Sequence, residues 1–124
     1  MKDIMFRLID RNLIVGYEQY MHFNDRIDWL YAETDNGVWG HDYPYHDHKE
    51  QFTGMKDKTG QNVYEGDIFD MGMGWIDVIK WNEEKAAFGQ WCPSKDKWDF
   101  HTLDGSIPDQ KIVGNIHDNP ELIK

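Results

Sequence analysis

The chain of 124 residues has little cysteine, few basic residues and no long apolar segment. Its single cysteine, Cys92, excludes an internal disulfide and a CxxC metal knuckle, and it is typical of a reducing compartment. No apolar run approaches the roughly 18 residues that a membrane-spanning helix needs. The first 12 residues place Asp3 and Arg7 among apolar ones and so lack the apolar core of a signal peptide. We therefore expect a cytoplasmic protein with no membrane association.

Basic residues are outnumbered, with 13 Lys and Arg against 23 Asp and Glu and a net charge of −10. Such a surface repels phosphate backbones, so nucleic-acid binding is disfavoured. A negative charge of this size mainly keeps a protein soluble, and it also complements a basic protein partner. A sharper hypothesis is that the acidic surface imitates DNA and blocks a basic protein.

Aromatic residues are abundant, with six Trp, six Tyr and six Phe, and they suit the pleated faces of β-strands. Apolar residues alternate with a period of two in residues 4–9 and 27–32, which predicts strands. Residues 13–23 fit either a strand or a helical face, and Gly16 and the aromatic side chains favour the strand. From residue 62 onwards, about five short strands at a spacing of 8–12 residues predict a small antiparallel barrel or sandwich.

Turn residues divide the N-terminal half. Asn36 and Gly37 both tolerate positive φ and predict a hairpin, so a strand from about Val38 should return against residues 27–32. The segment "HDYPYHDHKE", residues 41–50, contains a proline and predicts a loop.

The most patterned segment is "QFTGMKDKTGQNVYEGDIF", residues 51–69. Asp57 and Gly60 occupy the first and fourth positions of a predicted type I turn, in which the Asp side chain bonds the backbone two residues further on. Gly66 predicts a second bend, and residues 75–81 predict a central strand because both faces are mostly apolar. We therefore interpret the glycines of this segment as corners of a β-fold and not as contacts to a ligand.

Imidazole and carboxylate groups cluster in one loop, and both are ligands of Zn²⁺ and related metals. The candidate metal ligands are His41, Asp42, His46, Asp47 and His48. A metal site needs three or four ligands that converge, and a loop with a proline in it does not ensure this. We favour a solvated polar loop, no cofactor and no catalytic residues, and a metal-dependent enzyme that uses this loop is the competing hypothesis.

Two long segments carry a family resemblance. "QFTGMKDKTGQNVYEGDIF", residues 51–69, and "KIVGNIHDNPELI", residues 111–123, are similar to the YopX family of small proteins encoded mainly by bacteriophages and prophages. Residues 1–10 and 75–89 resemble the family more weakly. The resemblance implies a phage or prophage origin, and it carries over no catalytic residues.

The same resemblance implies an all-β fold in a single domain over residues 1–124. It implies a small antiparallel SH3-like barrel in residues 51–124, and an N-terminal β-hairpin extension with a variable loop in residues 1–50. Six tryptophans cannot all be central in so small a core, so we expect some to lie partly exposed, either at an interface or as part of ordinary sheet packing. We expect a non-catalytic protein-binding module that binds a protein partner and self-associates through its N-terminal strands.

Overall fold

The computed structural model describes residues 4–23, 26–34, 37–72, 75–92, 100–102 and 110–123. Its contacts divide the chain into two compact units, Met1–Gly54 and Met55–Lys124. The strands form two sheets, and the strand pairs with a described register are all antiparallel. The expected all-β class is therefore confirmed. Within these residues, no helix has the length and apolar character that crossing a membrane requires.

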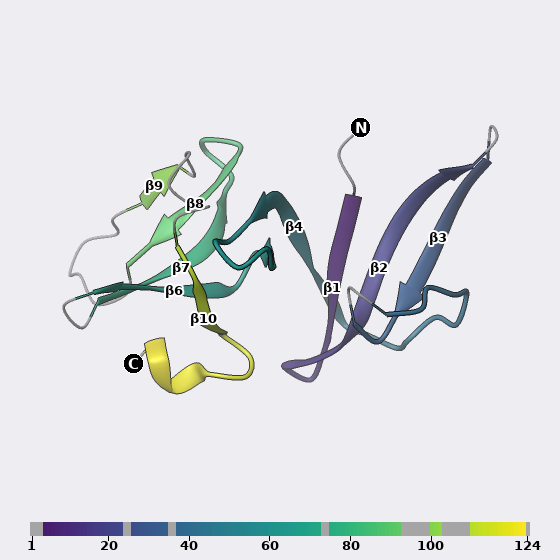
Figure 1. Ribbon diagram of the computed structural model, residues 1–124, viewed down its shortest axis with the longest axis horizontal. Helices are drawn as coiled ribbons and strands as arrows, with labels where there is room; N and C mark the ends of the chain where they lie inside the picture. Colours follow the sequence, from purple (N-terminus) through teal and green to yellow (C-terminus); the bar gives the residue numbers. More distant parts are fainter. Residues whose placement is uncertain are drawn as a thin grey trace. The chain divides into compact units, whose positions relative to one another are not determined.

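The first unit is a twisted antiparallel sheet in which β3, β2, β1 and β4 follow one another (Figure 1). Its strands are β1 (Ile4–Asp10), β2 (Leu13–Phe23), β3 (Arg26–Ala32) and β4 (His48–Lys56). The segment that fitted either a strand or a helix is a strand, as its aromatic residues favoured. Arg11 and Asn12 join β1 to β2 with φ angles of 52° and 63°, as a tight two-residue hairpin loop requires. β1 has a strand on both sides, because β2 and β4 both pair with it.

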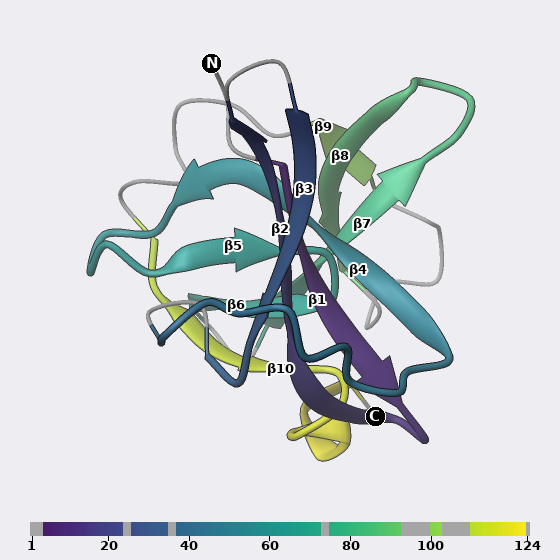
Figure 2. The ribbon, with the colours of Figure 1, turned by 90° about the vertical axis from the view of Figure 1, so that its right-hand side faces the viewer.

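The second unit holds a five-stranded sheet in the order β10-β6-β7-β8-β9, with β7 and β8 as a long hairpin (Figure 2). Its elements are β5 (Asn62–Tyr64), β6 (Asp67–Gly72), β7 (Trp75–Asn82), β8 (Ala87–Trp91), β9 (Phe100–Thr102), β10 (Ile112–Asn115) and the 3₁₀ helix η2 (Pro120–Ile123). The predicted central strand is β7, the middle strand of this sheet. β5 lies next to β4 in the other sheet, whose strand order is β3-β2-β1-β4-β5. Among the described strands, the first and last strands of each sheet do not pair with each other. The SH3-like barrel is therefore not confirmed.

The core of the second unit gathers around three fully buried side chains, Val63, Phe69 and Ile79. Phe69 lies opposite Ile112 of β10, and Ile112 packs against the same cluster. The last described strand of the chain therefore completes a core that begins with β5 and β6.

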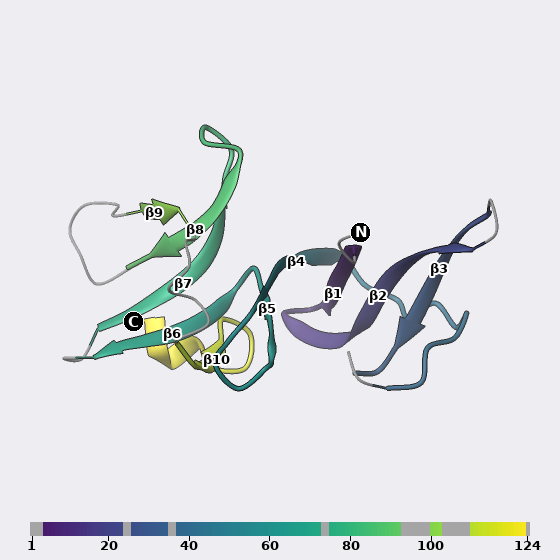
Figure 3. The same ribbon diagram turned by 45° about the horizontal axis from the view of Figure 1, so that its top comes forward.

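The segment between β3 and β4 differs from the expectation (Figure 3). The strand predicted from about Val38 is wrong, because only an isolated bridge forms, in which Tyr31 and Gly40 exchange two backbone hydrogen bonds of 2.7 and 2.8 Å. Asn36, half of the predicted hairpin turn, lies outside the described residues. The loop predicted for residues 41–50 ends earlier, since β4 begins at His48. We call the described residues between β3 and β4, which are 33–34 and 37–47, the crossing loop.

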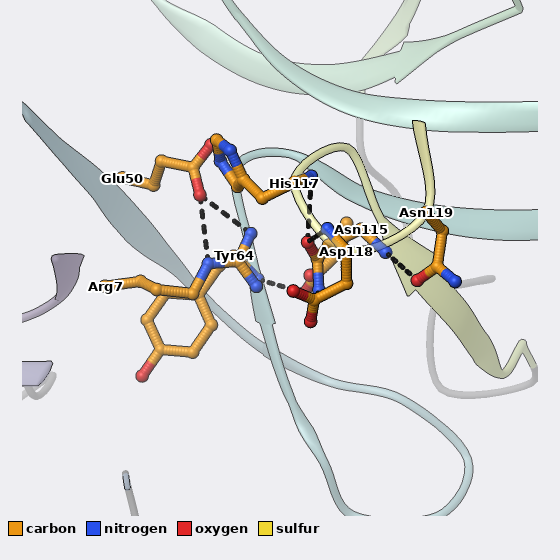
Figure 4. Close-up of polar contacts among 8 residues, drawn as sticks. Arg7, Glu50, Tyr64, Asn115, His117, Asp118 and Asn119 are labelled. Carbon is orange, nitrogen blue, oxygen red and sulfur yellow. Dashed lines mark hydrogen bonds and ion pairs between the residues drawn. The ribbon is translucent and has the colours of Figure 1, made fainter. Parts of the chain in front are cut away.

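A buried ion pair joins β1 to β4 (Figure 4). The register places Arg7 opposite Glu50, and both side chains are less than 5% exposed. Arg7 donates from Nε at 2.9 Å and from Nη2 at 2.8 Å to the same carboxylate oxygen of Glu50. Each of these two charges is thus paired inside the protein, as a buried charge requires.

The segment 51–69 is a corner, as its turn residues predicted. Asp57 Oδ1 accepts hydrogen bonds from the backbone nitrogen of Thr59 at 2.8 Å and from its hydroxyl at 2.7 Å. The backbone nitrogen of Gly60 donates to the Asp57 carbonyl at 3.0 Å, and Gly60 has a φ of +88°. Gly66 forms the second bend with a φ of 93°. These glycines provide backbone conformations that side-chain-bearing residues rarely adopt.

The second resembling segment, residues 111–123, is also a backbone corner. The side-chain oxygen Oδ1 of Asn115 accepts hydrogen bonds from the backbone nitrogens of His117 and Asp118, both at 2.9 Å (Figure 4). A Cβ at Gly114 would lie 2.5 Å from Oδ1 of Asn119, so a larger residue there would displace the Asn119 side chain. Both segments that carry the resemblance therefore form turns of the backbone.

We expect Gly60→Ala to lower the free energy of unfolding by roughly 1–2 kcal/mol, the cost of the left-handed conformation for an L-residue. A Cβ at Gly60 meets nothing within 4 Å, so a steric clash adds nothing to this cost. Gly40→Ala is the matched control, because its Cβ also enters open space and its φ is not in the left-handed region. Urea unfolding measures both variants, and equal stabilities would contradict the turn geometry.

Candidate binding site

One face of the first sheet carries large aromatic side chains. Cross-strand register places Phe6 opposite Glu18, Glu18 opposite Tyr31, and Tyr20 opposite Trp29. Because opposite residues share a face and alternate residues of a strand do too, these five side chains lie on one side of the sheet. We call this set the aromatic face.

Glu18 is the charged residue in the middle of the aromatic face, and it is only 2% exposed. Its carboxylate accepts a hydrogen bond from Lys49 Nζ at 2.7 Å and one from the Tyr31 hydroxyl. Lys49 Nζ also lies 5.2 Å from the ring centroid of Phe6 and 5.5 Å from that of Trp29, within the range of cation–π attraction. The buried carboxylate thus has a cation and a hydroxyl as partners, which offsets the cost of removing it from water.

Trp29 lies at the outer end of the aromatic face. Its ring packs edge-on against Tyr20, with centroids 5.0 Å apart and an interplanar angle of 70°. The ring centroid of Phe6, on β1 two strands away, lies 6.3 Å from that of Trp29. Trp29 is 37% exposed, which confirms that some tryptophans lie partly at the surface.

The environment of Tyr31 raises the pKa of its hydroxyl to about 12, from an ordinary value of 10.0. Burial contributes most, because it disfavours the phenolate anion. The hydrogen bond to Glu18 and the negative charge of Glu18 add to the increase, with smaller effects from Tyr43 and Asp28. Tyr31 is therefore a neutral hydrogen-bond donor at physiological pH.

The crossing loop covers the end of the aromatic face at Tyr31. The ring of Tyr43 packs edge-on against Tyr31, with centroids 5.1 Å apart and an interplanar angle of 76°. Pro44 lies over Gly16, where a Cβ would be 3.5 Å from the proline ring and 3.0 Å from the carbonyl oxygen of Ala32. The absence of a side chain at Gly16 thus lets the loop approach β2.

Backbone contacts fasten the far end of the crossing loop. The backbone nitrogen of Asp47 donates to the Ile9 carbonyl at 2.9 Å, and its carboxylate accepts from the backbone nitrogen of Arg11 at 3.2 Å. Together with the Tyr31–Gly40 bridge, these bonds hold the loop against the sheet at two points.

An open pocket of about 690 Å³ lies between the crossing loop and the edge of the sheet. Apolar groups, two tyrosines and two carboxylates line it: Val15, Tyr31, Ala32, Glu33, Thr34, Gly37, Val38, Gly40, Asp42, Tyr43 and Pro44. Tyr43 is 63% exposed, so its ring is accessible from solvent. We call this hollow the acidic pocket, because Glu33 and Asp42 are its only charged residues among those that the structure describes.

The structure separates the predicted metal ligands. His41 Nε2 donates to Asp28 Oδ2 at 3.0 Å, and His46 Nδ1 donates to the Pro44 carbonyl at 2.8 Å. Asp42 lines the acidic pocket, and His48 begins β4 as an exposed residue. In the part of the chain that is described, His41, Asp42 and His46 do not bring three ligand atoms within 4.8 Å of one another. Metal binding by this loop stays a prediction.

Sequence reasoning did not identify most of the site. Glu18, Tyr31, Tyr43 and Lys49 come from β2, β3, the crossing loop and β4, and no local motif links them. In "YEQY", residues 17–20, only Tyr20 shares a strand face with Glu18, so the local pattern does not indicate that this carboxylate is buried and paired.

We expect Tyr31 to titrate with a midpoint near pH 12, while an ordinary tyrosine titrates near pH 10. Because the folded-state pKa is raised, the resulting stability is fully present below about pH 10 and is lost as the pH rises through about 12. The tyrosinate absorbance of the wild type minus that of Tyr31→Phe isolates this group, and circular dichroism monitors folding in parallel. Tyr45→Phe is the control, and a Tyr31 midpoint near pH 10 in folded protein would contradict the buried hydrogen bond to Glu18.

No curated protein matches the chain. The family profile described as YopX protein matches residues 6–124, nearly the whole chain, so the resemblance carried by residues 51–69 and 111–123 is confirmed and the chain belongs to the YopX family.

Proposed function

We propose that this member of the YopX family is a non-catalytic binding module that takes a protein partner at the acidic pocket of its first unit. The observation that carries the proposal is the pocket itself, in which an accessible tyrosine ring lies beside two carboxylates. Aromatic side chains that combine a large apolar area with a polar tip are favoured at interfaces. We propose further that the protein is phage- or prophage-encoded and acts in the cytoplasm, which the family resemblance and the lone buried Cys92 support.

The charges next to the pocket support binding in preference to proton transfer. Tyr31 stays protonated at neutral pH because its pKa is about 12, so it is a poor general base. Glu18 is held by Lys49 and Tyr31, and its burial keeps it away from a reacting group in solvent. A rigid sheet with an anchored loop is a suitable frame for recognition.

The test is affinity capture from a bacterial lysate with three immobilised baits: the wild type, Tyr43→Ala and Tyr45→Ala. Tyr45 is the matched control because it is an exposed tyrosine of the same loop, at 77% exposure, and does not line the pocket. We expect at least one protein that the wild type and Tyr45→Ala retain and that Tyr43→Ala loses. That protein is then purified, and direct binding is measured by calorimetry with the same three variants. A set of captured proteins that is the same for all three baits would reject the acidic pocket as the binding site.

A further inference from the structure

We propose that the ligand of the acidic pocket is an arginine side chain presented by a basic segment of the partner. The inference rests on the proposed function and names the chemical group that the pocket recognises. It follows from the charge of the lining, the arrangement of the two tyrosine rings and the apolar residues of the lining.

The lining is complementary to a cation. Glu33 and Asp42 contribute carboxylates, and none of the described residues that line the pocket is basic. Lys49, the cation nearest to the aromatic face, is already bound to Glu18 at 2.7 Å. The net charge of −10 adds long-range attraction for a basic segment, which increases its rate of association.

The rings favour a flat cation. Tyr43 meets Tyr31 in an edge-to-face geometry at 5.1 Å, and it remains 63% exposed. An exposed aromatic face attracts a cation that stacks on it by about 0.5–1 kcal/mol. A guanidinium is planar, so it stacks on a ring while its five N–H donors reach a carboxylate in two parallel bonds. An ammonium is a compact point charge and makes only part of these contacts.

The apolar part of the lining suits the rest of an arginine side chain. Val15, Ala32 and Pro44 supply apolar surface, against which the three methylene groups of arginine can pack while the charged head stays near the rim. The volume of about 690 Å³ exceeds the needs of one side chain, so the pocket also accepts the neighbouring backbone of a peptide.

The first experiment titrates three capped tripeptides into the full-length, ¹⁵N-labelled protein. Their central residues are arginine, lysine and citrulline, the last being a neutral analogue of nearly the same shape as arginine. We expect the arginine peptide to bind with a Kd on the order of 1 mM, the scale of a few weak contacts. Amide shifts should be confined to Val15 and to residues 31–34 and 37–43. Citrulline should weaken binding by about tenfold or more, and lysine should fall between the two. Added salt should weaken binding of the arginine and lysine peptides and leave that of the neutral citrulline peptide unchanged.

The second experiment repeats the arginine titration with variants. Tyr43→Ala and Asp42→Asn should each weaken binding by about threefold or more, because each removes one exposed contact to the cation. Tyr45→Ala and Glu83→Gln are the matched controls. Glu83 is an exposed residue of the turn between β7 and β8 in the second unit, so its substitution makes the same change in net charge far from the pocket in sequence. Both controls should bind as the wild type does.

Several results would overturn the inference. Equal affinity for the arginine and citrulline peptides would show that charge plays no part, and shifts outside the lining residues would place the site elsewhere. Shifts of the pocket amides with protein concentration alone would identify a second copy of the chain as the occupant. If Tyr43→Ala loses a captured partner but the arginine peptide does not bind, the proposed function stands and this inference fails. If no partner depends on Tyr43, the proposed function itself fails.

Discussion

Arg7→Met should lower the free energy of unfolding by about 3–5 kcal/mol, the usual cost of removing one partner from a buried ion pair. The substitution leaves the carboxylate of Glu50 in a site where it is 2% exposed, without the two contacts that Arg7 Nε and Nη2 make to it. Methionine has a similar length, so lost packing adds little to the effect. Urea unfolding followed by circular dichroism measures the change.

Two further variants make this prediction specific. Arg11→Met is the matched control, because Arg11 is exposed in the β1–β2 turn and should change stability by no more than about 0.5 kcal/mol. In the double variant Arg7→Met/Glu50→Met, neither charge of the pair remains, so its cost should be smaller than the sum of the two single costs. Additive costs, or a loss below about 1 kcal/mol for Arg7→Met, would show that the pair does not hold β1 to β4.

Asp57→Ala should cost about 2–4 kcal/mol, because it removes a buried carboxylate that accepts four hydrogen bonds. Oδ1 accepts from the backbone nitrogen and hydroxyl of Thr59 and from the nitrogen of Gln61, and Oδ2 accepts from the nitrogen of Ile112 at 3.0 Å. The loss therefore affects both the corner and its attachment to β10. Asp70→Ala is the matched control, since the Asp70 carboxylate accepts a hydrogen bond from the backbone nitrogen of Gly72 at the exposed end of β6.

The contribution of Asp57 should also depend on pH. Burial alone would raise the pKa of its carboxyl, but the hydrogen bonds from the Thr59 side chain and from the backbone of Ile112, Gln61 and Thr59 outweigh burial and lower it below 3.8. A group with a lowered folded-state pKa stabilises the fold above its unfolded value and loses this effect as the pH falls through the folded value. The stability difference between the wild type and Asp57→Asn should thus be constant above about pH 5 and shrink below 3.8. A difference that does not change down to pH 2 would contradict the ionised acceptor.

Local chemistry explains which parts of the fold could be predicted. Asp57 and Gly60 determine their turn through contacts within four residues, and the alternating aromatic residues of 27–32 determine a strand. β4 was missed because its sequence, "HKEQFTGMK", is mostly polar, and its pairing depends on the distant partner β1. The strand expected from Val38 does not form among the described residues, where a single bridge between Tyr31 and Gly40 pairs this segment with β3.

The site was less predictable than the fold. Asp42 was selected as a metal ligand, and it lines the acidic pocket, where Val15 of β2 and Tyr31 and Ala32 of β3 join residues of its own loop. Nothing in the spacing of Tyr31 and Tyr43 indicates that their rings meet, because the approach depends on Gly16 leaving room for Pro44. Contacts between distant segments arise from packing and are absent from any local pattern.

The bond between Asp57 and Ile112 has a consequence for the order in which the protein can fold during its synthesis. The two residues are 55 positions apart, which a ribosome covers in roughly 3–11 s at 5–20 residues per second. β1 to β4 can pair once residue 54 has emerged, whereas Val63, Phe69 and Ile79 wait for Ile112 to complete their core. During this interval the nascent second unit exposes apolar side chains, and it is then that a chaperone would bind it.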